Sequence, residues 1–246
     1  MKRAFQMAAV GLLVVLSLGL VEAQFHLFGR LFRDLPLGQR ELATQFLGQY
    51  LAGQFPGKRA IVLSNPFSAK PGQPREVYEF EKAGLRGLRR GLGTAVKLEA
   101  VVYPDLRPEF FTNRQAVLID RSTKTPLSYL MTADALDKVV SQHPDAELVV
   151  SLIGLPVNVR ETEAWKSASG RRFALLLPDL RMVGNQAAIL QAVQSRKIAA
   201  FVLNKPGAPP EDQPLGRDLR MEFDQRFLLI NPETVDRYLE AFPRLF

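Results

Sequence analysis

Seven polar side chains in this 246-residue sequence stand where ligand chemistry could take place, because each follows a short apolar run. They are Ser64, Asn65, Tyr103, Asp105, Asp179, Asn204 and Lys205. Hydroxyl, amide, carboxylate and ammonium groups of this kind can orient a small molecule in a pocket. The same residue types are also common in turns, where they cap or restrain the backbone. Both interpretations, a binding site and ordinary turn chemistry, stay open on the sequence alone.

Side chains that could carry out a reaction are scarce. The chain has no Cys, which excludes disulfides, thiolate metal sites, cysteine nucleophiles and a lipid-modified cysteine. His26 and His143 are its histidines, and His143-Pro144 is typical of the end of a helix. The sequence has no phosphate-binding loop, Gly-x-Ser-x-Gly elbow or His-Glu-x-x-His helix. We therefore favour a protein that is not an enzyme, and we expect no cofactor.

The elements that position the seven side chains are predicted from an alternation of apolar runs with amphipathic stretches. The runs cover residues 60–63, 98–103, 148–153, 173–177, 199–203 and 227–230. Such alternation is typical of an α/β domain with a mostly parallel sheet of about six strands and helices on both faces, a three-layer sandwich. The carboxyl ends of parallel strands share one edge, where open sheets bind their ligands. The seven side chains should therefore gather on one rim.

Helices are predicted between these runs from apolar residues that recur at helical spacing. We expect a leading helix over 39–53 and four further helices over 76–90, 132–143, 186–197 and 231–242. Residues 115–130 do not follow this alternation and are expected to form a hairpin excursion. Residues 207–216 are expected to form a proline-rich loop. The basic residues at the end of the second helix suit the negative end of its dipole.

The N-terminus has the order of a signal peptide: basic Lys2 and Arg3, an apolar core over 8–20, and the small-residue boundary Val21-Glu22-Ala23. An uncleaved anchor is the alternative, but the apolar core is shorter than the ~20 residues that span a bilayer. We expect a signal peptide over 1–23, a leading helix and linker over 24–57, and one α/β domain over 58–246. The protein should be exported to the periplasm or the extracellular space, with no transmembrane span after cleavage.

Three stretches resemble the carboxyl-terminal lobe of type I periplasmic sugar-binding proteins. They are ADALDKVVSQHPDAELVVSLIGLP (133–156), RFALLLPDL (172–180) and NQAAILQAVQSRKIAAFVLNKPG (185–207). The ending LLINPETVDRYLEAF (228–242) is similar to the terminal strand and helix of that family, and Asn65-Pro66-Phe67 is similar to a turn of its other lobe. The resemblance implies a periplasmic-binding fold with Asp179 as the acidic residue after a strand. Residues 153–156 stand where the family has an Asn-Asp pair, and Glu81 where it often has Arg.

The family has two such lobes, and this chain has length for one. The expected function is thus an exported, non-enzymatic binding protein for a small solute or a protein partner, with self-association or another protein closing the half-cleft. The formal charge of +7 comes from scattered basic residues, so nucleic acid is not an expected partner. One alternative is a hydrolase that uses Asp105, Asp179 or Lys205 with a metal, if these side chains converge. Another is a structural envelope protein, if the largest exposed apolar patch lies away from the strand ends.

Overall fold

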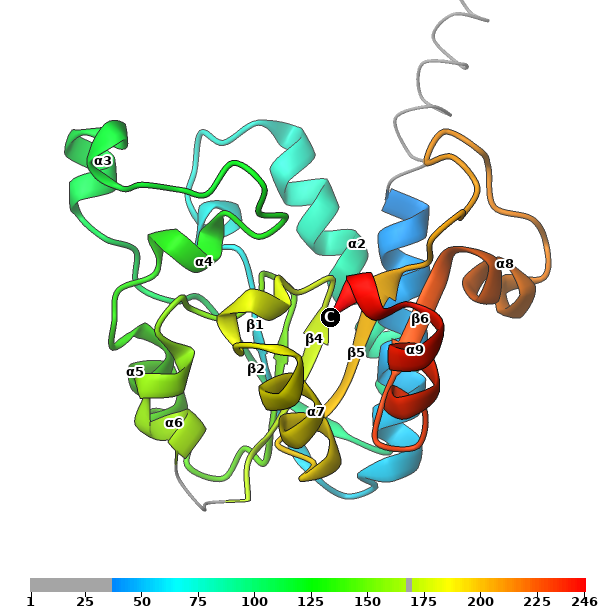
Figure 1. The fold of residues 1–246 in the computed structure, drawn as a ribbon. Coiled ribbons are helices and arrows are strands. Elements are labelled where there is room, and N and C mark those ends of the chain that lie inside the picture. The colour runs from blue at the N-terminus through cyan, green and yellow to red at the C-terminus, as the bar shows by residue number, and fades with distance from the viewer. Residues whose placement is uncertain (1–36, 167–169) are drawn as a thin grey trace, which may run out of the picture.

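The computed structural model describes residues 37–166 and 170–246, and the expected signal peptide lies outside them. Six strands form one sheet in the order β2-β1-β3-β4-β5-β6, with the first five parallel and β6 antiparallel to β5 (Figure 1). The strands are β1 (Arg59–Leu63), β2 (Lys97–Val102), β3 (Leu148–Ser151), β4 (Arg172–Leu176), β5 (Ile198–Asn204) and β6 (Phe227–Ile230). The six predicted runs and the mostly parallel sheet are confirmed.

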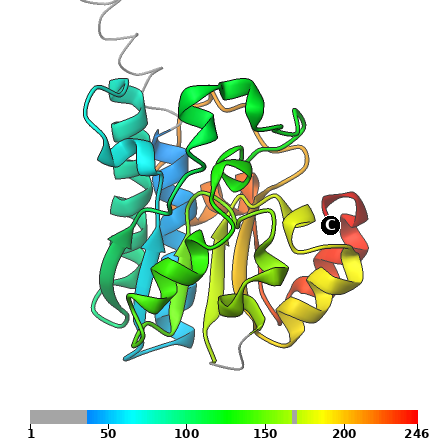
Figure 2. The same ribbon diagram turned by 90° about the vertical axis from the view of Figure 1, so that its left-hand side faces the viewer.

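Helices cover both faces of the sheet (Figures 1 and 2). One face is covered by α5 (Ala135–Ser141), α6 (Glu163–Lys166), α7 (Gln186–Gln194) and α9 (Val235–Ala241). The other is covered by the leading helix over 37–54, by α2 (Arg75–Leu92) and by α8 (Leu219–Arg226). The two faces hold separate apolar cores, and β3 is buried along its whole length between them. The predicted three-layer sandwich is confirmed.

The leading helix and α2 touch through their backbones, because glycines line the contact. A Cβ added at Gly87 would lie 2.0 Å from the carbonyl oxygen of Glu41, and one at Gly91 would lie 2.1 Å from that of Gln45. Only glycine allows so close a crossing. The basic end of α2 also meets this helix: Arg86 and Arg90 pair with the carboxylate of Glu41 at 2.8 and 2.9 Å.

The predicted hairpin over 115–130 is wrong. This segment contains a 3-10 turn, η2 (Arg114–Ala116), and the short helix α4 (Leu127–Leu130), and within the described residues of 103–147 there is no strand, only an isolated bridge. A two-stranded hairpin is marginal unless something covers it, and Leu118, in the middle of the expected strand, is 88% exposed. The segment instead turns at Asp120, whose carboxylate accepts the N–H of Ser122 at 2.8 Å.

Further elements differ from the prediction. The helix α8 was not predicted, because Leu219 and Met221 face outward and only Phe223 of its large apolar residues is buried. The last helix begins at Val235, because the Asn231 side chain accepts the N–H of Glu233 in a separate turn before it. Short helical turns follow two strands, η1 (Pro66–Ala69) after β1 and α3 (Glu109–Thr112) after β2. Among the described residues, no helix combines the length and apolar character needed to cross a bilayer.

Candidate ligand pocket at the strand ends

Ser64 and Asn65 follow β1, and the structure uses both side chains locally. Ser64 is fully buried and donates a hydrogen bond to Glu81 Oε2 at 2.8 Å. Asn65 caps η1 by accepting the N–H of Phe67 at 2.9 Å. Neither side chain lines the pocket described below.

A buried ion pair fills the space beside Ser64. Arg40 of the leading helix lies 2.7 Å from Glu81 of α2, and the two side chains are 6% and 5% exposed. Arg40 also donates to the carbonyl oxygen of Leu152, just past β3, at 3.2 Å. Burial lowers the pKa of Arg40 from its usual value, although the charge of Glu81 and the hydrogen bond to it oppose this shift. In a sheet of this order, the crevice between β1 and β3 is the usual ligand site, and here protein occupies it.

Tyr103 and Asp105 follow the edge strand β2, which pairs with β1, and both lie outside the pocket described below. Tyr103 is 41% exposed. Asp105 forms an exposed ion pair with Lys138 of α5 at 3.2 Å. Lys205, after β5, donates to the carbonyl oxygen of Asp224 at 2.8 Å and lines a separate hollow between α8 and α9.

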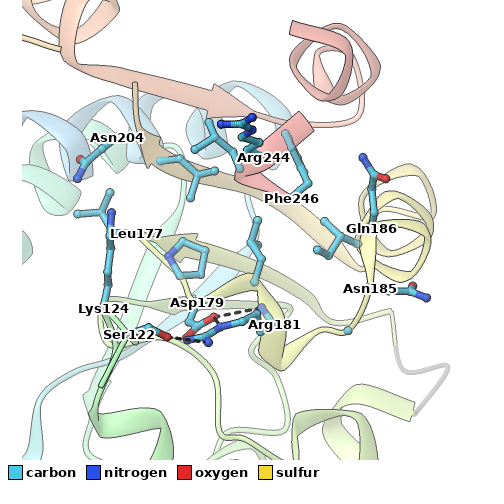
Figure 3. Close-up of a pocket in the computed structure, with 16 residues that line it drawn as sticks. Ser122, Lys124, Leu177, Asp179, Arg181, Asn185, Gln186, Asn204, Arg244 and Phe246 are labelled. Atoms are coloured by element: carbon cyan, nitrogen blue, oxygen red, sulfur yellow. Dashed lines mark hydrogen bonds and ion pairs between the residues drawn. The ribbon is translucent and has the colours of Figure 1, made fainter. Parts of the chain in front are cut away.

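Asp179, which follows β4, and Asn204, the last residue of β5, do line one common pocket of about 420 Å³ (Figure 3). Figure 3 shows Lys124 and Asn204 on one side of it, Asn185 and Gln186 on the other, and Arg244 opposite the Asp179–Arg181 pair. Leucine, isoleucine and proline side chains and Phe246 supply apolar surface between these polar groups. The lining segments are the 122–124 loop, the turn η4 (Leu180–Met182), the start of α7 and residues 244–246.

The Asp179–Arg181 pair forms several hydrogen bonds within the pocket lining. Arg181 donates from Nη2 to Asp179 Oδ2 at 2.5 Å and from Nε to Oδ1 at 2.8 Å, a two-point contact. Thr123 donates to the same carboxylate at 2.7 Å. These bonds, chiefly those from Arg181, lower the pKa of Asp179, and the carboxylate in turn raises the pKa of Arg181. Arg181 also reaches Asp120 Oδ2 at 2.7 Å, so one guanidinium joins the 120–123 loop to η4.

Two cations of the lining remain available. Lys124 and Arg244 are both exposed, and their charged groups have no partner within residues 37–166 and 170–246. Neither of them, nor Arg181, is among the site residues predicted from the sequence. The polar residues 120–124 lie within the predicted hairpin, so the sequence indicates a turn there and not a pocket wall. Nothing in the sequence indicated that residues 244–246 return to the strand ends.

The backbone at the pocket is strained at one residue. Leu177 directly follows β4 and lines the pocket with a φ of 44°, in the left-handed region that residues other than glycine seldom adopt. Such conformations cost about 1–3 kcal/mol and gather at ligand sites.

The side chains of the metal-hydrolase alternative do not converge. Asp105, Asp179 and Lys205 are held by three different partners, the Lys138 side chain, the Arg181 side chain and the Asp224 carbonyl. Over the described ranges, no group of three or more His, Asp and Glu side chains is placed to hold a metal ion.

No family model and no curated protein matches this sequence. Solved structures that resemble the chain include a glucose-galactose binding protein, GanP, from Geobacillus stearothermophilus (12% identity, TM-score 0.45, 80% of this chain and 61% of that one). Another is a carbohydrate transporter solute binding protein from Agrobacterium radiobacter in complex with D-arabinose (14% identity, TM-score 0.46, 82% and 62%). A third is a sugar-binding protein of a sugar ABC transporter from Bacillus halodurans (13% identity, TM-score 0.42, 79% and 64%). The chain matches less than two thirds of each of these proteins.

Proposed function

We propose that this protein binds a small polar solute in the pocket at the carboxyl ends of β4 and β5, without transforming it. The observation that carries the proposal is the lining itself: the hydrogen-bonded Asp179–Arg181 pair and amide groups from two segments, the start of α7 and the end of β5, surround a partly apolar hollow of about 420 Å³. A few placed polar groups on an apolar background are typical of small-molecule sites. The strain at Leu177, in the same lining, supports this location.

Binding is favoured over acid–base catalysis by the charge states of the pair. The pKa of Asp179 is lowered and that of Arg181 is raised, so both groups keep their charge across neutral pH. A general acid or base works best when its pKa lies near the working pH. The pair is therefore suited to holding a ligand through fixed charges.

The most exposed large apolar side chains help to weigh the alternative of a structural envelope protein and to locate a surface for a protein partner. They follow the carboxyl ends of strands or lie in the helices beside them: Phe80, Tyr103, Phe111, Leu118, Leu219 and Met221. They thus share the edge that carries the pocket, which does not favour a purely structural role. We include in the proposal that a second copy or another protein meets this edge and closes the half-cleft, and that the order of residues 2–23 directs export.

The test is a thermal-shift screen against sugars, nucleosides and divalent ions, followed by Asp179→Ala. At a hundredfold excess over the dissociation constant, a ligand should stabilise the native chain by about 2.7 kcal/mol. Asp179→Ala should abolish this gain and cost about 1 kcal/mol of stability without ligand, because Asp179 caps η4.

Asp105→Ala is the matched control, since Asp105 also follows a strand and pairs with a basic side chain but lies outside the pocket. It should keep the full ligand response. Equal responses of the native chain and Asp179→Ala would reject this pocket as the site.

A further inference from the structure

A basic cluster lies at the opposite end of the sheet, where β4 and β5 begin, near α6 at the lower end of the molecule in Figure 1. Two adjoining hollows of about 250 and 320 Å³ share Trp165, Ser195 and Lys197 in their lining. Six cationic side chains line one or both: Arg160, Lys166, Arg171, Arg172, Arg196 and Lys197. Among the described residues, no carboxylate lines either hollow.

Backbone carbonyls and aromatic rings hold several of these cations in place. Arg171 donates to the carbonyl oxygens of Ala146 and Pro144 at 3.1 and 3.0 Å. Arg172 donates to the carbonyl oxygen of Arg196 at 3.3 Å. Lys197 Nζ lies 6.0 Å from the centre of the Trp165 ring. Such contacts orient the cationic groups but do not neutralise their charge.

The acidic side chains nearest to this end of the sheet in the sequence are engaged in ion pairs. The pairs are Asp145 with Arg59 (2.9 Å), Glu147 with Lys58 (2.6 Å), Glu163 with Lys166 (3.6 Å) and Glu233 with Arg196 (3.6 Å). The last two reach members of the cluster, but all four side chains of these pairs are at least half exposed and solvent screens them.

The basic cluster therefore keeps a net positive charge after its ion pairs are counted. Arg160, Arg171 and Arg172 have no carboxylate partner in the part of the chain that the structure describes. The C-terminal end of α7 supplies at most about half a negative charge. The neighbouring positive charge also acts on Lys197. Burial lowers the pKa of Lys197 most, and the charge of Arg171 lowers it further. A bound anion would relieve this repulsion.

We propose that the basic cluster is a second binding site, which takes a ligand bearing a phosphate or sulfate group. Guanidinium groups present several N–H donors in a fixed plane, which suits the oxygens of a tetrahedral anion. A group with up to two negative charges matches several uncompensated cations better than a single carboxylate does. The ligand could be a free anion or a group on a larger molecule, and the chemistry of recognition is the same.

This site is separate from the pocket at the strand ends. Helix α7 begins with Gln186 in the lining of that pocket and ends beside Ser195 in the basic cluster. Nine helical residues span about 14 Å. Trp165, which lines both basic hollows, is the sole tryptophan of the chain. Its fluorescence therefore reports on this end of the molecule.

The experiment is a titration of the full chain with inorganic phosphate, inorganic sulfate and a heparin oligosaccharide, read by Trp165 fluorescence. We expect a saturable change with at least one of them. Arg171→Gln and Lys197→Gln should each weaken binding by about tenfold or more, since each removes a charge-assisted contact. Arg89→Ala, an exposed cation on α2, should bind like the native chain.

The three probes separate the sources of the anion. Saturation by phosphate or sulfate supports a free anion, and saturation by the oligosaccharide alone supports a group carried on a polymer. No saturable change with any probe, or an equal loss in Arg89→Ala and Arg171→Gln, overturns the proposal. Asp179→Ala should keep the fluorescence response, so failure of the strand-end pocket and failure of this site are distinguishable.

Discussion

Two arginine–carboxylate pairs lie at the same edge of the sheet, and they differ in burial. Arg40 and Glu81 are 2.7 Å apart with side chains 6% and 5% exposed, at the ends of β1 and β3. Arg181 and Asp179 are 2.5 Å apart with side chains 51% and 7% exposed, at the end of β4. The pKa of Arg40 is lowered by burial, whereas that of Arg181 is raised by its carboxylate.

The opposite shifts show how one kind of pair can serve two purposes. The buried pair has lost its water, so each charge depends on the other and on the helices that supply them. It fills the crevice that a sheet of this order offers to ligands. The exposed pair keeps solvent on the guanidinium side and can form bonds to a third group. Filling the first crevice leaves β4 and β5 to provide the open pocket.

The largest expected effect is on the buried pair. Glu81→Ala should lower the free energy of unfolding by about 3–5 kcal/mol, because it leaves Arg40 charged and buried without its carboxylate. Urea unfolding measures the loss. The double variant Arg40→Met with Glu81→Leu should recover most of it, because no unpaired charge remains. A loss no larger than that of Asp179→Ala would remove the distinction between the pairs.

The second largest effect is expected at the contact between α2 and the leading helix, which carries Arg40. Gly87→Ala places a methyl group against the Glu41 backbone and should cost about 1–3 kcal/mol, since a carbonyl cannot move aside as a side chain can. Gly53→Ala is the control: it lies in the last turn of the leading helix with open space around it and should gain up to about 1 kcal/mol. A neutral Gly87→Ala would show that the two helices can separate, and calorimetry distinguishes these outcomes.

A smaller effect is expected at the exposed pair. Arg181→Gln should cost about 0.2–1 kcal/mol, because solvent screens the half-exposed guanidinium and because Thr123 and the backbone N–H of residue 181 still donate to the Asp179 carboxylate. The difference from the native chain should shrink in 1 M salt, since salt screens exposed charges. Parallel urea titrations at low and high salt measure it. A loss that is large and independent of salt would mean that this pair, too, is part of the scaffold.

The smallest expected effect is on acid stability. Because the folded pKa of Asp179 is below its unfolded value of about 3.9, its contribution is present above about pH 4 and fades as the pH falls through the folded pKa. The stability difference between the native chain and Asp179→Asn should therefore be constant from pH 5 to 8 and decrease in stronger acid. Unfolding midpoints over this range test it, and a difference that grows in acid would contradict the sign of the shift.

The sequence predicted the sheet well because β-rich apolar runs, such as those of β3 and β5, are local patterns. It placed the polar residues on one edge for the same reason. It could not show that Ser64 serves a buried network, because that network needs Arg40, which lies 41 residues before Glu81. The pocket walls at 122–124 and 244–246 have no periodic pattern, so their return to the strand ends follows from tertiary packing alone.

The position of the leading helix has a consequence for the order of folding. One face of the sheet is covered by α5, α7 and α9, which adjoin their strands in the sequence. The other face is completed by the stacking of Phe46 of the leading helix on Phe223 of α8, with ring centres 4.4 Å apart across almost the whole described chain. Contacts between distant segments slow folding, because a long loop must close before they form. A nascent chain that lacks α8 would thus leave part of this apolar face uncovered, and joining the two ends should be the late step of refolding.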